Sequence, residues 1–513
     1  MKQFNYKHTT HLLLAGSLWL TAGCSDFLKE EDPSNIAPAT FFTVPEHAQA
    51  AVDGTYENLR FHGDGAGIFS ANFQMLDAFS GTAETETGQN SDLNNLYSFQ
   101  HTGDNLHLSQ WWRQLYEGIG NANLAIEKIP TIPAIKEADS KKWVGQAKFL
   151  RAFHYFWMVR LWGDVPLLTK PIYSFTAPEV TPGRASVAEV YAQIEADLLD
   201  AENAGLPWTD LAGRASLASV KSLLANVYLT EAGYPLNKGG EYYQKAAAKA
   251  KEVIDYSIAN PGQVNLFGSY DDLHNNATEN RIEHIFQIQY AAGIANSNYQ
   301  SYFLPNNTNI TASGEVGTTV PTASFLNSFE AGDKRVEEKQ FFFSSYYAGG
   351  DGAVFPLNKP YIFKHFDVIA NGSPGNSGTG NAGLNYPLIR FAEVLLTYAE
   401  AQNESGGPSV EAYAAVNRIR SRANLTDLSG LSQSQFREAV WRERWHELCY
   451  EGITWFDMVR LRKVYKDDTS TFEDFVGGTL STAVVLQQKH LLLPLPAGDF
   501  RNNPNLRPDN PGW

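Results

Sequence analysis

The 513-residue chain has only two cysteines, Cys24 and Cys449, and it has fewer basic than acidic side chains, which gives a formal charge of -16 at pH 7. Two cysteines exclude a dense disulfide framework, so the fold must depend on a large apolar core. The shortage of basic residues argues against binding to a phosphate backbone. The sequence therefore predicts a globular protein with no nucleic-acid partner.

Recognisable catalytic motifs are also missing, since the chain has no H-E-x-x-H, no nucleophile elbow and no P-loop. His101 and His107 match no common metal-site spacing, and we interpret them as exposed polar side chains. A surface glycoside hydrolase would need two carboxylates brought together by folding, and Asp77, Glu84 with Glu86, and Asp271 with Asp272 lie in loop-rich stretches. Such loop carboxylates are more often solvated turn residues, so we expect no catalytic residue, no metal and no cofactor.

The N-terminal region has an apolar run, residues 12–20, that is too short to span a bilayer. Two lysines precede it and small residues follow, up to Cys24, which is the pattern of a lipoprotein signal peptide over residues 1–23. An ordinary secretory signal is the alternative, because Leu20 lies one position further from Cys24 than in the usual lipoprotein signal. Acylation of Cys24 would anchor the protein through several fatty chains, and residues 24–45 would form an acidic tether.

Helical periodicity dominates the first half of the remaining chain. Apolar residues at helical spacing predict helices over residues 46–60, 111–129, 140–162, 186–203, 217–231 and 242–256. His154 lies on the apolar face of the third of these, so we interpret it as a core histidine rather than a metal ligand. Residues 61–108 are irregular, and between Pro261 and Asn385 short strand-like runs alternate with Gly, Asn and Ser, which indicates a loop-rich lobe.

Three more helices are predicted near the C-terminus, with their start and stop signals intact. The first covers residues 388–403, and the run SGGP at 405–408 ends it before Ser409 caps the second. A third opens with a capping box formed by Ser432 and Gln435. The short loops predict hairpins of the tetratricopeptide-like kind, so the fold class is mainly α, a superhelical scaffold with an inserted mixed lobe.

The third helix carries an acidic row that should repel itself unless cations face it. We expect a structural ion-pair network between helices, with a solvated charged face as the alternative. Its predicted members are Glu443, Glu447 and Glu451 on one side and Arg418, Arg420, Arg422, Arg444 and Arg460 on the other.

Several runs resemble the signature of the RagB/SusD family. They are YPLIRFAEVLL at 386–396, AEA at 399–401, VNRIR at 416–420, ERWHEL at 443–448, RAFHYF at 151–156, WGDVPL at 162–167, LPLP at 493–496, NPNL at 503–506 and NPGW at 510–513. The resemblance implies a lipoprotein on the outer membrane, facing the cell exterior, that captures glycans without catalysis and closes over a SusC-like TonB-dependent transporter. It also implies one SusD-like domain over residues 46–513, with a helical scaffold at about 46–260 and 385–465, the lobe at 261–384 and an extended segment at 466–513.

Glycan sites need exposed aromatic rings surrounded by polar side chains, and three stretches of the chain combine them. The candidates are Tyr299, Tyr302 and Asn298 in the first, Tyr97, Asp77 and Asn94 in the second, and Tyr346 in the third. For each ring, packing in the core is as plausible as sugar binding. Two rival functions stay open: a surface hydrolase, and a tetratricopeptide-like scaffold without sugar affinity.

Overall fold

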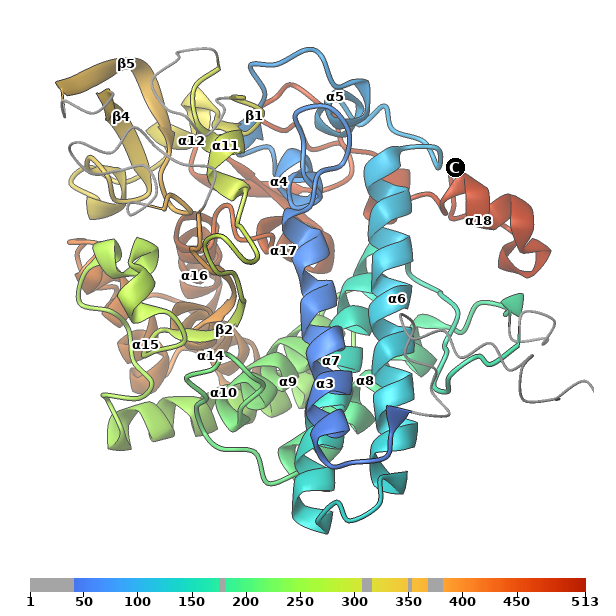
Figure 1. Cartoon of the computed structure of the whole chain (residues 1–513). Helices are drawn as coiled ribbons and strands as arrows, with labels where there is room; N and C mark the ends of the chain where they lie inside the picture. Colours follow the sequence, from blue (N-terminus) through green and yellow to red (C-terminus); the bar gives the residue numbers. More distant parts are fainter. Residues whose placement is uncertain (1–40, 175–179, 307–315, 349–352, 368–381) are drawn as a thin grey trace, which may run out of the picture.

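The computed structural model describes residues 41–174, 180–306, 316–348, 353–367 and 382–513 (Figure 1). The predicted signal peptide, Cys24 and most of the predicted tether lie outside these ranges. Within them, no helix is both long enough and apolar enough to cross a membrane.

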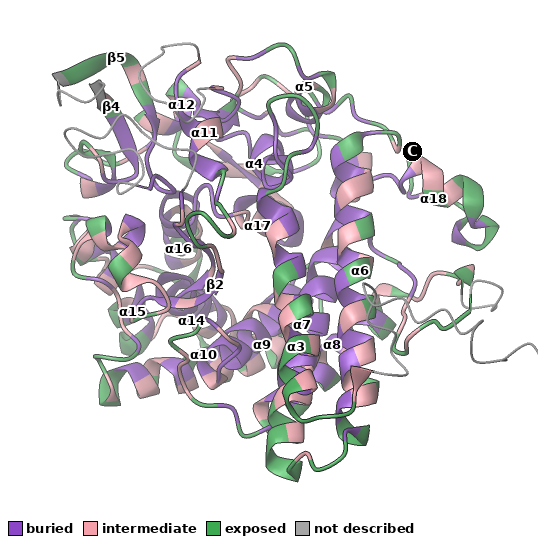
Figure 2. Cartoon of the chain, viewed as in Figure 1, coloured by how far each residue is buried: buried purple, intermediate pink, exposed green. Residues whose placement is uncertain are grey.

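An array of packed helices forms most of the molecule, as the periodicity predicted (Figure 1). Its main members are α3 (Glu46–Asn58), α6 (Leu106–Lys128), α7 (Glu137–Trp162), α8 (Val187–Glu202), α9 (Leu217–Ala232), α10 (Gly240–Ala259), α14 (Phe391–Gly406), α15 (Val410–Arg422), α16 (Gln433–Glu447) and α17 (Thr454–Leu461). Consecutive helices pack as hairpins, and α14 packs on α10, which joins the two halves of the scaffold. Figure 2 shows buried residues on the faces that meet and exposed residues on the outer faces.

Local sequence signals set most helix ends well, with two exceptions. The helix predicted from Trp111 begins five residues earlier, at Leu106, after the cap residue Asn105. The predicted capping box is confirmed, since the Ser432 hydroxyl accepts from the backbone of Gln435 and the Gln435 side chain accepts from the backbone of Ser432. The helix predicted from Leu388 begins instead at Phe391, because Tyr386–Arg390 forms strand β6. Its backbone pairs antiparallel with β2 (His284–Ile288), a partner about a hundred residues away that local periodicity does not reveal.

The stretch predicted to be irregular, residues 61–108, contains two short helices, α4 (Gln74–Ser80) and α5 (Ser91–Tyr97). They lie at one end of the scaffold beside α11 (Tyr299–Phe303), α12 (Ala323–Asn327) and the hairpin of β4 (Phe342–Ala348) and β5 (Ala353–Ile362) (Figure 1). Strand β1 (Ala83–Glu84) pairs with β3 (Val320–Pro321) and ties the two groups together. The segment 466–513 is not uniformly extended, because it contains β8 (Thr471–Asp474), which pairs with β7 (Lys463–Lys466), and α18 (Ala497–Asn502).

The acidic row is buried rather than solvated, although α16 ends at Glu447 and Glu451 lies in the turn after it. Glu447 has no exposed surface, and its carboxylate lies 2.8 Å from Arg422, 3.2 Å from Arg390 and 3.4 Å from Arg335. Two of these three cations, Arg390 and Arg335, were not in the predicted set because they come from β6 and from the lobe. The row therefore joins elements that lie far apart in the sequence.

The other two carboxylates of the row are held in the same way. Glu443 lies 3.2 Å from Arg420, and Glu451 lies 2.6 Å from Arg390 and contacts Lys364. Burial disfavours ionisation of Glu451, but Arg390 and Lys364 outweigh it and hold its pKa at about 2. These ion pairs fix how α16 crosses its neighbours.

Three predicted members of the network do not contact the row. Arg418, one turn before Arg422 on α15, donates to the side-chain oxygen of Asn265 at 2.5 Å instead. Arg444 and Arg460 both lie 2.8 Å from Asp457 of α17 and form a separate cluster. His154 is a buried core histidine, as predicted, with its ring nitrogens 2.6 Å from the Leu150 carbonyl and 2.9 Å from the Asn58 side chain.

Candidate functional site

A surface cleft lies beside the predicted aromatic stretches, between the loop after β1, the end of α11 and strand β5. Its volume is about 450 Å³, and it is lined by Glu86, Pro305, Asn306, Phe355, Pro356, Leu357, Asn358 and Tyr361. Glu86 follows β1, Pro305 and Asn306 follow α11, and the remaining residues belong to β5. The cleft therefore forms only when residues more than two hundred positions apart come together.

Backbone pairing holds these three segments in place. The Glu86 amide donates to the Gly317 carbonyl at 2.9 Å, and the Val316 amide donates to the Ser301 carbonyl at 3.1 Å. Strand β5 is fixed by β4, in which Tyr346 is the backbone partner of Phe355. Such pairing gives the cleft a rigid frame, which a binding site on loops needs.

Polar groups converge on one carboxylate at the cleft. Glu86 accepts a hydrogen bond from the Tyr361 hydroxyl at 3.0 Å and from the Asn306 amide at 3.3 Å, and it lies 2.9 Å from the Lys359 ammonium. Burial and the neighbouring Glu86 charge raise the pKa of Tyr361, so this hydroxyl stays protonated as a donor. Asn358 adds a side-chain oxygen 3.4 Å from the same hydroxyl.

Apolar groups form the rest of the cleft. The Phe355 side chain is 42% exposed, which is unusual for a phenylalanine, and two prolines and Leu357 lie beside it. Exposed rings give platforms for the C–H faces of sugars, while carboxylates and amides take the hydroxyl groups. The cleft thus has the size and the mixture of surfaces that one or two sugar rings require.

The structure corrects the predicted exposure of Tyr299. Its side chain is 2% exposed, and its ring stacks on Tyr386 with the centroids 4.6 Å apart. The hydroxyl lies 2.9 Å from Nδ1 of His62 and 3.1 Å from the hydroxyl of Tyr290. A Cβ atom at Gly63 would lie 3.0 Å from the Tyr299 ring, so the close approach that buries the ring depends on this glycine.

Two further candidates are buried for similar reasons. The Tyr97 hydroxyl donates to the Thr318 carbonyl at 2.9 Å, and the side chain is covered by the lobe. Asp77 is 3% exposed on α4, where burial raises the pKa of its carboxyl to about 8. The histidines predicted to be exposed, His101 and His107, are also buried, His101 against the rings of Phe79, Phe99 and Trp513 and His107 within α6.

The remaining candidates reach solvent to different degrees. Asn298 is exposed, whereas Asn94 and Tyr302 are half-buried, and Tyr302 packs edge-on against Phe73 with ring centroids 5.8 Å apart. The side chain of Tyr346 lies outside the described residues. The sequence analysis did not identify Phe355 and Asn358 as candidates. The signal was present, since Phe355 is an aromatic residue near proline and asparagine, which is the pattern that selected the other candidates.

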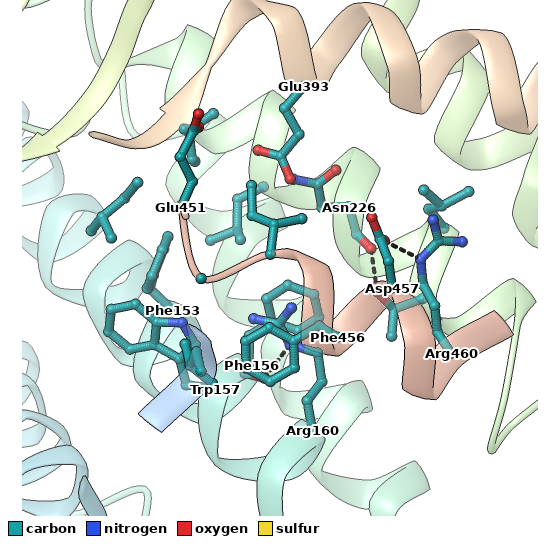
Figure 3. A pocket seen from close by; sticks show the side chains of 18 of the residues that line it. Phe153, Phe156, Trp157, Arg160, Asn226, Glu393, Glu451, Phe456, Asp457 and Arg460 are labelled. Carbon is teal, nitrogen blue, oxygen red and sulfur yellow. Dashed lines mark hydrogen bonds and ion pairs between the residues drawn. The ribbon is translucent and has the colours of Figure 1, made fainter. Parts of the chain in front are cut away.

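A second pocket, shown in Figure 3, is too small to hold a sugar ring, with a volume of about 50 Å³. Among its charged lining groups, Asp457 lies 2.8 Å from both Arg444 and Arg460, and Glu451 is held by Arg390 and Lys364. Among the residues that the structure describes, no group of three histidine, cysteine or carboxylate side chains is placed to hold a metal ion.

Comparison with known proteins places the chain in a family. A sequence profile described as "SusD family" matches residues 337–513, and one described as "Starch-binding associating with outer membrane" matches residues 27–229. A SusD-like protein of Formosa agariphila is 31% identical, over 96% of this chain and 97% of its own length. The chain belongs to the SusD family. The starch-binding protein SusD of Bacteroides thetaiotaomicron is 24% identical over 72% of this chain and 73% of its own length.

Solved structures agree with this assignment. A SusD-superfamily protein of Parabacteroides distasonis superposes with a TM-score of 0.85 at 35% identity, over 91% of this chain and 99% of that protein. A laminarin-binding SusD-like protein superposes with a TM-score of 0.73 at 23% identity, over 92% of this chain and all of that protein, which shows a shared fold. The helical SusD-like architecture predicted from the sequence is therefore confirmed.

Proposed function

We propose that this SusD-family protein binds glycans at the cell surface and that the cleft at Phe355 is where it does so. The observation that carries the proposal is the composition of the cleft, in which an exposed ring lies beside Glu86, Asn306 and Asn358. Relatives named for starch or laminarin binding share the fold, which supports a glycan as the ligand class. Tyr302, Asn298 and Asn94 are additional candidates at the same end of the molecule.

The same cleft favours binding over hydrolysis. A glycosidase of the common kind needs two carboxyl groups across the scissile bond, and the described residues lining the cleft include a single carboxylate, Glu86. That carboxylate is also engaged by Lys359 and Tyr361. We therefore infer a binding protein that hands its ligand on unchanged.

Delivery and anchoring complete the proposal. We infer that Cys24 carries lipid and holds the protein on the outer membrane, facing outward, so that it can pass oligosaccharide to a SusC-like TonB-dependent transporter. A family description that names association with the outer membrane supports this placement.

The test is a glycan array with the mature protein, followed by calorimetry with the best oligosaccharide. Phe355→Ala should weaken binding about tenfold or more, since stacking on an aromatic ring contributes roughly 1–3 kcal/mol where it has been measured for planar ligands. Val354→Ala is the matched control, because Val354 is 62% exposed on the same strand but does not line the cleft.

Four outcomes separate the readings. Loss of affinity in Phe355→Ala alone supports the cleft, whereas equal affinity in both folded variants moves the site elsewhere. No affinity for any glycan supports the scaffold alternative, and release of shortened oligosaccharides by the purified protein supports the hydrolase.

A further inference from the structure

A larger cavity lies between helices of the scaffold and the C-terminal segment. Its volume is about 730 Å³, and it is enclosed by parts of α7, α8 and α17 together with C-terminal residues between 488 and 511. Apolar side chains, among them Tyr191, Phe456 and Leu491, form much of its wall. It shares no lining residue with the cleft, so it is a separate feature.

The charged residues of this cavity are mostly cations without anionic partners. Five lining residues have no carboxylate oxygen within 4.0 Å among the residues described, namely Arg160, Arg184, Arg462, Lys489 and Arg507. The two lining carboxylates each accept a backbone N–H through one oxygen, Asp164 from Val187 at 2.8 Å and Asp509 from Leu495 at 2.9 Å, and their charges act on Arg184. A concentration of positive charge in a chain of net charge -16 is the opposite of what composition alone would give.

Arg160 shows most clearly the lack of an anionic partner. Its guanidinium lies between the rings of Phe156 and Phe456, 3.6 Å from each centroid, and its Nε donates to the Phe156 carbonyl at 2.8 Å (Figure 3). Burial lowers the pKa of Arg160 to about 10. Arg460, at the same wall, is also buried, but Asp457 and Glu400 outweigh that effect and raise its pKa.

Arg462 provides a second, independent sign of a missing partner. It follows α17 in a left-handed backbone conformation, with φ +56°, which few residues other than glycine adopt. Its guanidinium lies 5.1 Å from the centre of the exposed Tyr234 ring. Its Nη1 atom is buried and has no hydrogen-bond partner, although buried donors of this kind are nearly always satisfied.

Arg160 and Arg462 are partly or fully removed from water and have no carboxylate contact, so they are prepared for an anion from outside. Charge-assisted hydrogen bonds to guanidinium are strong and directional. We propose that this cavity binds a small organic anion, a molecule with a carboxylate or sulfate group on a compact body that the apolar walls cover. The anionic group lies between Arg160 and Arg462, and the volume suits a ligand of one or two sugar rings.

The experiment measures calorimetric affinity of the mature protein for glucuronate, for glucose 6-sulfate and for neutral glucose. We expect one or both anions to bind, glucose not to bind at this cavity, and the affinity to fall as ionic strength rises. Binding of glucuronate alone assigns a carboxylate ligand, and binding of the sulfate ester alone assigns a sulfate ligand. Failure of both anions overturns the proposal.

Variants then locate the site. Arg462→Gln and Arg160→Gln should each weaken anion binding about tenfold or more, as expected for the loss of one charge-assisted contact. Arg113→Gln is the matched control, because Arg113 is an exposed guanidinium that lines a different cavity of about 770 Å³. If Arg160→Gln does not fold, Arg507→Gln at the exposed rim replaces it.

The variant results also separate this proposal from the glycan cleft. Phe355→Ala should leave anion affinity unchanged, and anion binding that disappears in Phe355→Ala would place the anion in the cleft and overturn the cavity assignment. Unchanged affinity in the folded Arg462→Gln and Arg160→Gln variants would overturn it equally.

Discussion

Arg390 holds Glu451 through two hydrogen bonds in the interior, 2.9 Å from Nε and 2.6 Å from Nη2. The pair joins the end of β6 to the turn between α16 and α17, so it connects the lobe side of the molecule to the helical scaffold. Bidentate contacts of this kind restrict both distance and angle. The two sequence runs that carry the family resemblance, around residue 390 and at 443–452, therefore meet in one buried ion-pair cluster.

Removing a carboxylate from this junction should destabilise the protein strongly. Glu447→Ala leaves Arg422, Arg390 and Arg335 with one carboxylate fewer in the interior, and an uncompensated buried charge costs about 3–5 kcal/mol. Urea unfolding should therefore show a much lower midpoint. Glu438→Ala on the same helix is the control, because Glu438 is exposed, and it should change the midpoint little. A similar midpoint for both variants would contradict the role given to the junction.

Sequence reasoning succeeded where the determining contacts are local. The Ser432 and Gln435 box starts α16 through neighbours three residues apart, so it can be recognised in the sequence. The acidic row was recognised for the same reason, but Arg390 as its partner was not, since it lies 57 residues from Glu447.

Exposure of loop aromatics was the least predictable property. Tyr299 is covered because Gly63 and His62, more than two hundred residues earlier, approach its ring. Phe355 stays exposed because its strand β5 lies at the surface of the lobe. Both facts depend on long-range packing, which composition and spacing do not contain.

Substitution of Tyr299 should lower the stability of the fold. Tyr299→Phe removes the hydroxyl that lies against His62 and Tyr290, and stranding a buried polar partner costs about 1–3 kcal/mol. Thermal and urea unfolding should both show the loss. Tyr302→Phe is the comparison, since Tyr302 is half-buried, and its effect should be smaller. An unchanged stability in Tyr299→Phe, with weakened glycan binding, would restore the original expectation for this residue.

Asp77 should make stability fall as pH rises. Burial raises the pKa of its carboxyl from 3.8 to about 8, with Lys364 opposing and Glu451 adding to the shift. Between these values the folded protein retains a proton that the unfolded chain releases, so the free energy of unfolding decreases with pH by at most roughly 1.4 kcal/mol per unit. Above pH 8 this contribution is constant, and below pH 4 it does not oppose folding.

The check is urea unfolding of the protein and of Asp77→Asn from pH 5 to pH 9. The variant should gain stability over the unmodified protein as pH rises, because its amide does not ionise. In Asp77→Asn, part of the decrease in the free energy of unfolding with rising pH should remain, since burial also raises the pKa of Glu279 and of Glu393 to about 7. Asp92→Asn, at a half-exposed position, should run parallel to the unmodified protein. Parallel curves for Asp77→Asn would show that the carboxyl is not protonated in the fold.

Lipid attachment at Cys24 is the prediction on which placement at the membrane depends. The described residues contain no helix that could cross a bilayer. Stable anchoring takes more than one acyl chain, and a lipoprotein cysteine supplies several. Cys24→Ala should therefore move the protein from the outer-membrane fraction to a soluble fraction, while Cys449→Ala, at a buried position, should leave the distribution unchanged. Retention of Cys24→Ala in the membrane of cells that lack the proposed transporter would show a different anchor, and retention only when the transporter is present would show that the partner holds the protein there.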